Sequence, residues 1–219
     1  PATAGQNTVR IGVSAGGSAT VNKFIAIGDY AGSMAKGANN IMMGFRTAWG
    51  FGRAGNANNN VVIGHFAGSG NQNHTGAHDN TIIGDYAALT IGGGAYNTIL
   101  GSRAGYSISS GNYNTLIGYH AGYKMTGSNN VIIGSEAGYN LNASNQLRIS
   151  NTGSEALITG DFANKEVHIY DTLKLGVANS ATENAGNLTI YGKSNDANKK
   201  PTLILDGDGT VQQINFKFK

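Results

Sequence analysis

The stretch Asn130-Val-Ile-Ile-Gly134-Ser-Glu-Ala-Gly138 is one copy of a motif that recurs eight times along the chain. The central glycine lies at Gly12, Gly28, Gly44, Gly64, Gly84, Gly101, Gly118 and Gly134, in steps of 16, 16, 20, 20, 17, 17 and 16 residues. Positions are counted from this glycine, so that Ile133 is at −1 and Ala137 at +3. A short, near-constant period is typical of a solenoid, in which one coil cannot bury its apolar face alone. We therefore expect an all-β repeat solenoid of 16–20 residues per coil.

The three residues before each glycine have the composition of a short β-strand. Position −1 is apolar and position −3 is β-branched in all eight copies, which favours strand over helix. Alternation places both on one face, which we expect to point into the coil. Position −2 would then point outward, yet it is apolar in seven of eight copies. An apolar stripe on a surface needs a partner, so we expect an interface between chains at Met42, Val62, Ile82, Ile99, Leu116 and Ile132.

Small and amide side chains recur at two further positions. Position +3 is alanine in seven copies, with Thr47 the exception, as expected of a small buried corner. Position −4 is asparagine in the last six copies, which predicts either a hydrogen-bond ladder between coils or a left-handed turn. At position −2, Arg10 in the first copy and Arg148 in a degenerate ninth copy predict polar caps at the two ends of the stripe.

The period stops near residue 150, which predicts two regions. Residues 1–150 form the repeat domain, and residues 151–219 contain short alternating runs bounded by Gly, Asn or Asp, such as Ala156–Thr159, Glu166–Tyr170 and Asn187–Tyr191. Runs of this kind are typical of short strands joined by turns. We expect residues 151–219 to be a smaller β-rich shaft or trimerisation region.

Composition narrows the classes of partner. The net charge is only +3 over 219 residues without a basic cluster, so no nucleic-acid partner is expected. The chain has no cysteine, which excludes disulfides and thiolate metal sites. We expect no cofactor and no metal. No stretch approaches the roughly 18 apolar residues of a membrane span, so membrane insertion is not expected.

The repeated Asn-x-x-Ile-Gly-x-x-Ala-Gly unit resembles the head repeats of trimeric autotransporter adhesins of the YadA type, and related repeats in phage fibres. The resemblance covers about residues 7–150. It implies a left-handed parallel β-roll with three chains around a common axis, so the six residues at position −2 would form the trimer interface. The 20-residue steps and the Ala-Gly endings depart from the family pattern. The segment Asn187–Gly192 followed by Pro201–Gly209 is similar to shaft segments of phage and other virion fibres.

The two 20-residue steps hold the candidate ligand-binding loops, because insertions in solenoids map to loops on one face. They contain Trp49, Phe51 and Arg53 in one loop and His74 and His78 in the other. Trp49 is placed to stack on a sugar and Arg53 to bond its hydroxyls. The alternative is that Trp49 packs over its own coil or against the next subunit. Tyr106, Tyr123 and Tyr139 share position +5, which favours a packed aromatic stack over a carbohydrate site.

We expect a structural protein, not an enzyme, because the sequence has no nucleophile elbow, phosphate loop or cysteine nucleophile. The expected function is an extracellular fibre or adhesin segment of a phage virion or bacterial surface. It would assemble as a homotrimer, join other fibre proteins, and present loops to a host-surface glycan or receptor. Two alternatives stay open. One is a left-handed β-helix enzyme, either an acyltransferase or a glycan-cleaving spike, and the other is an ice-binding solenoid.

Overall fold

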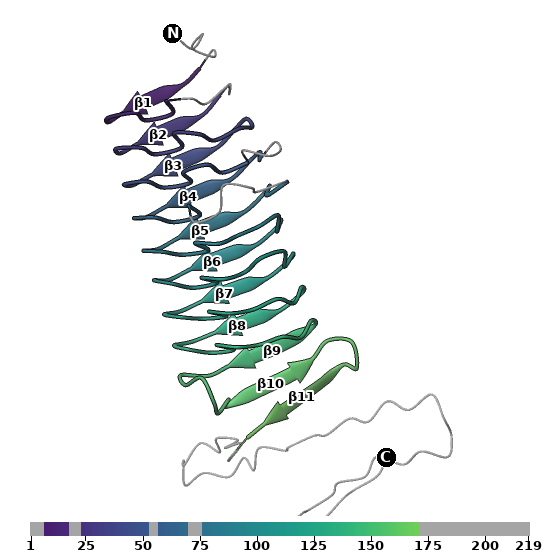
Figure 1. Ribbon diagram of the computed structural model, residues 1–219. Coiled ribbons are helices and arrows are strands. Elements are labelled where there is room, and N and C mark those ends of the chain that lie inside the picture. Colours follow the sequence, from purple (N-terminus) through teal and green to yellow (C-terminus); the bar gives the residue numbers. More distant parts are fainter. Residues whose placement is uncertain (1–6, 18–22, 53–56, 70–75, 171–219) are drawn as a thin grey trace, which may run out of the picture. The chain divides into compact units, whose positions relative to one another are not determined.

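The computed structural model describes residues 7–17, 23–52, 57–69 and 76–170. Its strands form one eleven-stranded sheet, paired in sequence order (Figure 1). They are β1 (Val9–Ile11), β2 (Ile25–Ile27), β3 (Ile41–Met43), β4 (Val61–Ile63), β5 (Thr81–Ile83), β6 (Thr98–Leu100), β7 (Thr115–Ile117), β8 (Val131–Ile133), β9 (Gln146–Ile149), β10 (Ile158–Asp161) and β11 (Glu166–Ile169). The described residues contain strands and turns but no helix, so the predicted all-β class is confirmed.

Strands β1 to β9 are parallel and stack in one register. Each repeat contributes one strand, and equivalent positions pair, as Ile99 does with Ile82 and with Leu116. This is a β-solenoid, as the repeat predicted. The 20-residue steps leave the register unchanged, because Met42 pairs with Val62 and Val62 with Ile82. The additional residues therefore lie in the turns between strands.

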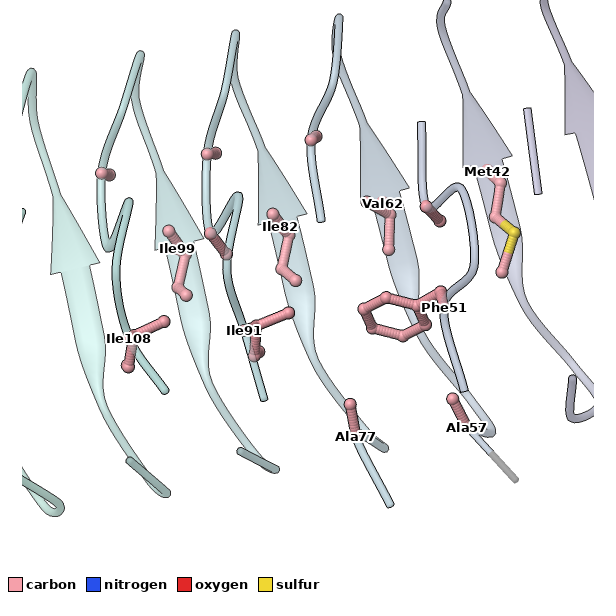
Figure 2. Close-up of a cluster of buried hydrophobic side chains, with 14 of the residues drawn as sticks. Met42, Phe51, Ala57, Val62, Ala77, Ile82, Ile91, Ile99 and Ile108 are labelled. Carbon is pink, nitrogen blue, oxygen red and sulfur yellow. The ribbon is translucent and has the colours of Figure 1, made fainter. Parts of the chain in front are cut away.

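Position −2 fills the interior of the coils. Met42, Val62, Ile82, Ile99, Leu116 and Ile132 are all 0% exposed within this single chain. The residues at −3 and −1 are half-buried or exposed. The prediction that these six residues form a trimer interface is therefore wrong, because their side chains already pack inside their own coils. Figure 2 shows four of them, Met42, Val62, Ile82 and Ile99.

A narrow interior explains this orientation. The layer opposite each strand consists mainly of Ala at +3 and Gly at +4, and a Cβ added to Gly122 would lie 3.1 Å from the Leu116 side chain. One larger side chain joins this layer at position +7, where Phe51, Ile91, Ile108 and Met125 are fully buried. The interior thus accepts one strand side chain per coil, each worth roughly 2 kcal/mol when buried. The pair at −3 and −1 must then point outward.

Glycine at position 0 is required by conformation and by space. Its φ lies between 116° and 145° in all eight copies, a region that L side chains rarely adopt. A Cβ on Gly84 would lie 2.3 Å from the carbonyl oxygen of Gly101 in the next coil. The glycine column therefore sets how closely successive backbones stack.

The asparagines at position −4 form a buried hydrogen-bond ladder. Asn97 Nδ2 donates to Asn80 Oδ1 at 3.0 Å and to the Gly111 carbonyl at 2.9 Å. Asn97 Oδ1 accepts the backbone N–H of Asn114 at 2.9 Å. The left-handed turn falls one residue earlier, at Asn39 (φ 60°) and its equivalents. Of the two predicted roles for position −4, the ladder is confirmed.

The two ends of the stack differ from its middle. Arg10 and Arg148 occupy position −2 at the two ends, and the Arg10 guanidinium lies 5.1 Å from the Phe24 ring centroid. Beyond β9 the pairing becomes antiparallel through β10 and β11. These two strands overlap the runs predicted at 156–159 and 166–170. The runs predicted after residue 170, with most of the region 151–219, lie outside the described residues.

Candidate functional site

The predicted loop residues do not all reach the surface. Phe51 is fully buried at position +7, so its assignment as a ligand-binding residue is wrong: the ring fills the interior beside Val62 (Figure 2). Trp49 and His78 are half-buried. Arg53 and His74 lie outside the described residues. The signal that places Phe51 in the core is its spacing from Gly44, which matches that of Ile91 from Gly84.

His78 is held by its immediate neighbours. Its Nδ1 lies 2.7 Å from Asp79 Oδ2, and its ring packs edge-on against Tyr96 at 5.0 Å between centroids. Asp79 Oδ1 also accepts a hydrogen bond from Asn59 Nδ2 at 3.1 Å. The hydrogen bond from His78, followed by that from Asn59, lowers the pKa of Asp79. The described residues contain no cluster of three or more His, Asp or Glu side chains that would hold a metal ion.

A second surface, which sequence analysis did not single out as a site, lies directly after each glycine. We define the corner surface as positions +1 and +2 of six successive coils, all exposed or half-buried. It consists of Asp29, Tyr30, Phe45, Arg46, His65, Phe66, Asp85, Tyr86, Ser102, Arg103, Tyr119 and His120. Because the strand turns sharply at the glycine, these side chains point away from the interior.

The +2 side chains of five coils lie on one another as a stack of planar groups. The Arg46 Cζ lies 5.5 Å from the Tyr30 ring centroid and 5.7 Å from that of Phe66. Phe66 stacks on Tyr86 with centroids 5.3 Å apart and planes inclined by 4°. Arg103 Cζ lies 5.8 Å from the Tyr86 centroid. Tyr30, Arg46, Phe66, Tyr86 and Arg103 are called the planar stack below.

The carboxylates of the corner surface are already engaged, whereas its arginines are not. Asp85 Oδ1 lies 2.8 Å from His65 Nδ1, and Asp29 Oδ1 accepts the backbone N–H of Val13 at 2.8 Å. Neither Arg46 nor Arg103 has a carboxylate within ion-pair distance among the described residues. The surface therefore offers two guanidinium groups whose N–H donors remain available.

Two tyrosine columns are packed stacks. Tyr123 lies 4.8 Å from Tyr106 and 4.7 Å from Tyr139 between ring centroids, with planes inclined by 18° and 13°. Tyr96 and Tyr113 stack at 4.8 Å and 4°. The expected packing at position +5 is confirmed. The ring faces that stack on one another are covered, so these faces are not open to a sugar.

His120 is the residue of the corner surface whose pKa is shifted by its surroundings. Its ring stacks on Tyr119 at 3.9 Å and contacts Tyr123 at 4.6 Å, and its buried Nε2 has no hydrogen-bond partner. This burial lowers the pKa of His120 below its usual value of 6.5, the Arg103 charge lowers it further, and Glu136 acts in the opposite direction. The neutral imidazole is therefore the form that the fold favours.

We expect the NMR titration of His120 to show a pKa below 6.5. Arg103→Gln should raise that pKa and Glu136→Gln should lower it further. Because the unfolded chain binds the proton more tightly, the contribution of His120 to stability is complete above pH 6.5 and is lost as the pH falls toward the folded-state pKa. His120→Asn identifies the resonance, and a titration midpoint at or above 6.5 contradicts the described burial.

The outer face of the sheet, opposite to the side chains that fill the interior, is the other candidate surface. Over β2 to β8, positions −3 and −1 provide fourteen outward side chains, of which eleven are Ile, Val, Leu or Met and three are Thr. None of the fourteen is charged. With strands spaced about 4.8 Å, this outer face extends over roughly 29 Å. Leu100, for example, remains 46% exposed in the single chain.

Comparison of the chain with protein-family models, curated proteins and solved structures gives no match. Among the described residues, none lies in a helix long and apolar enough to cross a membrane.

Proposed function

We propose that this chain is a structural segment of an extracellular fibre or adhesin, assembled through the outer face of β2 to β8. The observation that supports it is the apolar composition of that face, which has eleven aliphatic side chains in fourteen outward positions and no charge. Isolated apolar side chains on a surface are common, but a continuous uncharged stripe is typical of an interaction site. The six interior residues play no part in this interface.

The partner that fits the outer face best is another copy of the same chain. Side chains on this face recur at the spacing of stacked strands, because β2 to β8 pair in one register. A second copy has the same axial spacing by construction, so its side chains match coil by coil along the whole face. The resemblance of the repeats to trimeric adhesin heads supports three copies, packed around an axis parallel to the coils.

Light scattering behind a sizing column should give three times the 22.6 kDa mass of one chain, about 68 kDa. Ile63→Lys/Ile83→Lys places two charges side by side on the outer face, because these residues pair across β4 and β5. We expect this variant to run at 22.6 kDa with an unchanged circular dichroism spectrum, since both side chains point away from the interior. Charges brought together in a dry interface cost far more than charges in water.

The matched control is Leu157→Lys/Val167→Lys, which introduces the same charges at two other exposed apolar positions, 56% and 64% exposed. It should keep the mass of the trimer. A wild-type chain of 22.6 kDa, or dissociation of both variants alike, contradicts assembly through the outer face.

One observation favours a second candidate, an ice-binding solenoid. Thr81, Thr98 and Thr115 lie outward in three adjacent paired strands, a regular hydroxyl row on a flat face. This function needs the face to be open to solvent, so it requires a monomer. A monomeric chain that produces thermal hysteresis would establish it in place of the fibre.

A further inference from the structure

The backbone at position +2 is left-handed in all eight coils, although His120 is the only residue there of a type that is enriched in this conformation. The φ values run from 49° to 58°, at Ser14, Tyr30, Arg46, Phe66, Tyr86, Arg103, His120 and Glu136. A left-handed conformation costs most side chains roughly 1–2 kcal/mol, and Gly, Asn and Asp are the usual solutions. The chain instead carries large planar side chains at most of these positions.

The same chain provides its own comparison at position −5. That position is also left-handed in nine successive coils, and six of its nine residues are Asn or Asp, as the backbone prefers. The two columns share the conformation but differ in the side chains that occupy it. Strained residues concentrate where a side chain has a role that offsets the strain. The identity of the +2 side chains therefore matters beyond the turn itself.

The planar stack holds Arg46 between rings of two neighbouring coils, and it holds Arg103 against the ring of Tyr86. Arg46 lies between Tyr30 and Phe66, and it is also 5.5 Å from the Phe45 ring. Rings above and below the guanidinium leave its N–H edge as the accessible side. A guanidinium held against aromatic faces is weakly hydrated and preorganised, and its edge matches a carboxylate or sulfate group in a bidentate way.

The charges of the corner surface indicate how widely the acid groups of a matching ligand are spaced. From Asp29 to Arg103 the surface carries Arg46 and Arg103 together with Asp29 and Asp85, so the formal charge sums to zero with histidine neutral. The two arginines are three coils apart, about 14 Å at strand spacing. A densely charged polyanion such as nucleic acid would meet both aspartates, whereas a chain with widely spaced acid groups would not.

We propose that the corner surface binds an acidic polysaccharide that lies along the coils, with its acid groups on Arg46 and Arg103. The intervening sugar hydroxyls have hydrogen-bonding partners in the Tyr86 hydroxyl and in the His65–Asp85 pair. An extended ligand suits this surface because the side chains form an open periodic row, on which only many repeated contacts give useful affinity. All residues of this site belong to one chain.

The test measures binding of the full chain to hyaluronan and gellan, two polysaccharides with spaced carboxylates, and to neutral dextran, by biolayer interferometry. Wild type should bind at least one of the two acidic chains and not dextran. Arg46→Ala/Arg103→Ala should weaken that binding by about tenfold or more for each arginine lost. Arg46→Lys/Arg103→Lys keeps both charges but not the planar N–H edge, and should also lose most of the affinity.

Lys36→Ala/Lys124→Ala is the matched control, because it removes two exposed positive charges away from the corner surface. It should bind like wild type. Alanine is compatible with the backbone at these sites, as Ala48 and Ala88 already have φ of 50° and 48°. Light scattering should give the wild-type mass for the arginine variants, which separates this site from the outer face.

Four results overturn the proposal. They are no binding of wild type to either acidic polysaccharide, equal loss in the lysine control, tighter binding of densely sulfated heparin than of either carboxylated chain, and a fall in assembly mass on Arg46→Ala/Arg103→Ala. The last would make the planar stack an interface between chains. A trimer without polysaccharide binding would refute this site and leave the fibre proposal standing.

Discussion

Gly84→Ala should destabilise the solenoid by about 3 kcal/mol or more. The added Cβ would lie 2.3 Å from the Gly101 carbonyl oxygen and 2.6 Å from its carbon, both backbone atoms of the next coil. The residue also has φ of 145°, which alanine adopts only under strain. Relief requires β5 and β6 to move apart, and their pairing is what continues the stack. Denaturant unfolding at fixed protein concentration measures the loss.

Gly76→Ala is the control that introduces the same kind of backbone strain without a contact between coils. Gly76 also has positive φ, 76°, but an added Cβ would meet nothing within 4 Å. Its substitution should cost only the left-handed strain, about 1–2 kcal/mol. If the two alanine variants lose the same stability, the close approach of backbones at position 0 does not limit the stacking of coils.

The repeat spacing was sufficient to predict the architecture. Eight glycines at steps of 16 to 20 residues place one strand before each glycine, and the structure has β1 to β8 at those positions. Register followed from the same count, because equivalent positions of successive copies must pair. The backbone contact at the glycine and the amide hydrogen bonds of Asn97 involve only neighbouring coils. The residues that make them are therefore present in each copy of the motif.

The direction of the strand side chains was not predictable from the strand alone. In a three-residue strand with three apolar positions, alternation allows either face to be the interior, and the sequence alone favours the face with two side chains. The deciding information lies in the opposite layer, where Gly105 and Gly122 leave room only for the side chain at −2. Ala-Gly at +3 and +4 is therefore the sequence signal for an inward −2 residue.

Phe51 shows the same limitation in a loop. A phenylalanine between glycines in a 20-residue step predicts an exposed insertion and hence a ligand-binding residue. Its distance from Gly44 is the same as that of Ile108 from Gly101, and both are fully buried. The insertion begins after this position, so counting from the preceding glycine identifies Phe51 as core.

The corner surface could not be found from composition. Its left-handed backbone at +2 leaves no trace in the sequence, because Tyr30, Arg46 and Phe66 are not residues that mark such turns. The repeat count places these three residues at equivalent positions of successive coils. Only the backbone angles show that the positions are strained, and only the structure shows that Arg46 lies over the rings of Tyr30 and Phe66.

Asn97→Leu should cost about 2–5 kcal/mol, although leucine has the same number of side-chain heavy atoms and the same branching as asparagine. The substitution leaves the Asn114 backbone N–H and the Gly111 carbonyl without their partners in a buried ladder, where water does not replace them. Each unsatisfied buried group costs roughly 1–3 kcal/mol. Asparagine at −4 is thus fixed by the hydrogen bonds of the two adjoining coils, and not by the turn that precedes it.

Amide hydrogen exchange tests this assignment at the atom concerned. The Asn114 amide proton should be protected in the wild type and should exchange faster in Asn97→Leu, because its acceptor is the deleted Oδ1. Asn142→Leu removes an exposed amide whose contact is with Thr126, and should leave both stability and Asn114 exchange unchanged. Unchanged Asn114 protection in Asn97→Leu would show that packing of the coils, and not the amide ladder, holds successive turns in register.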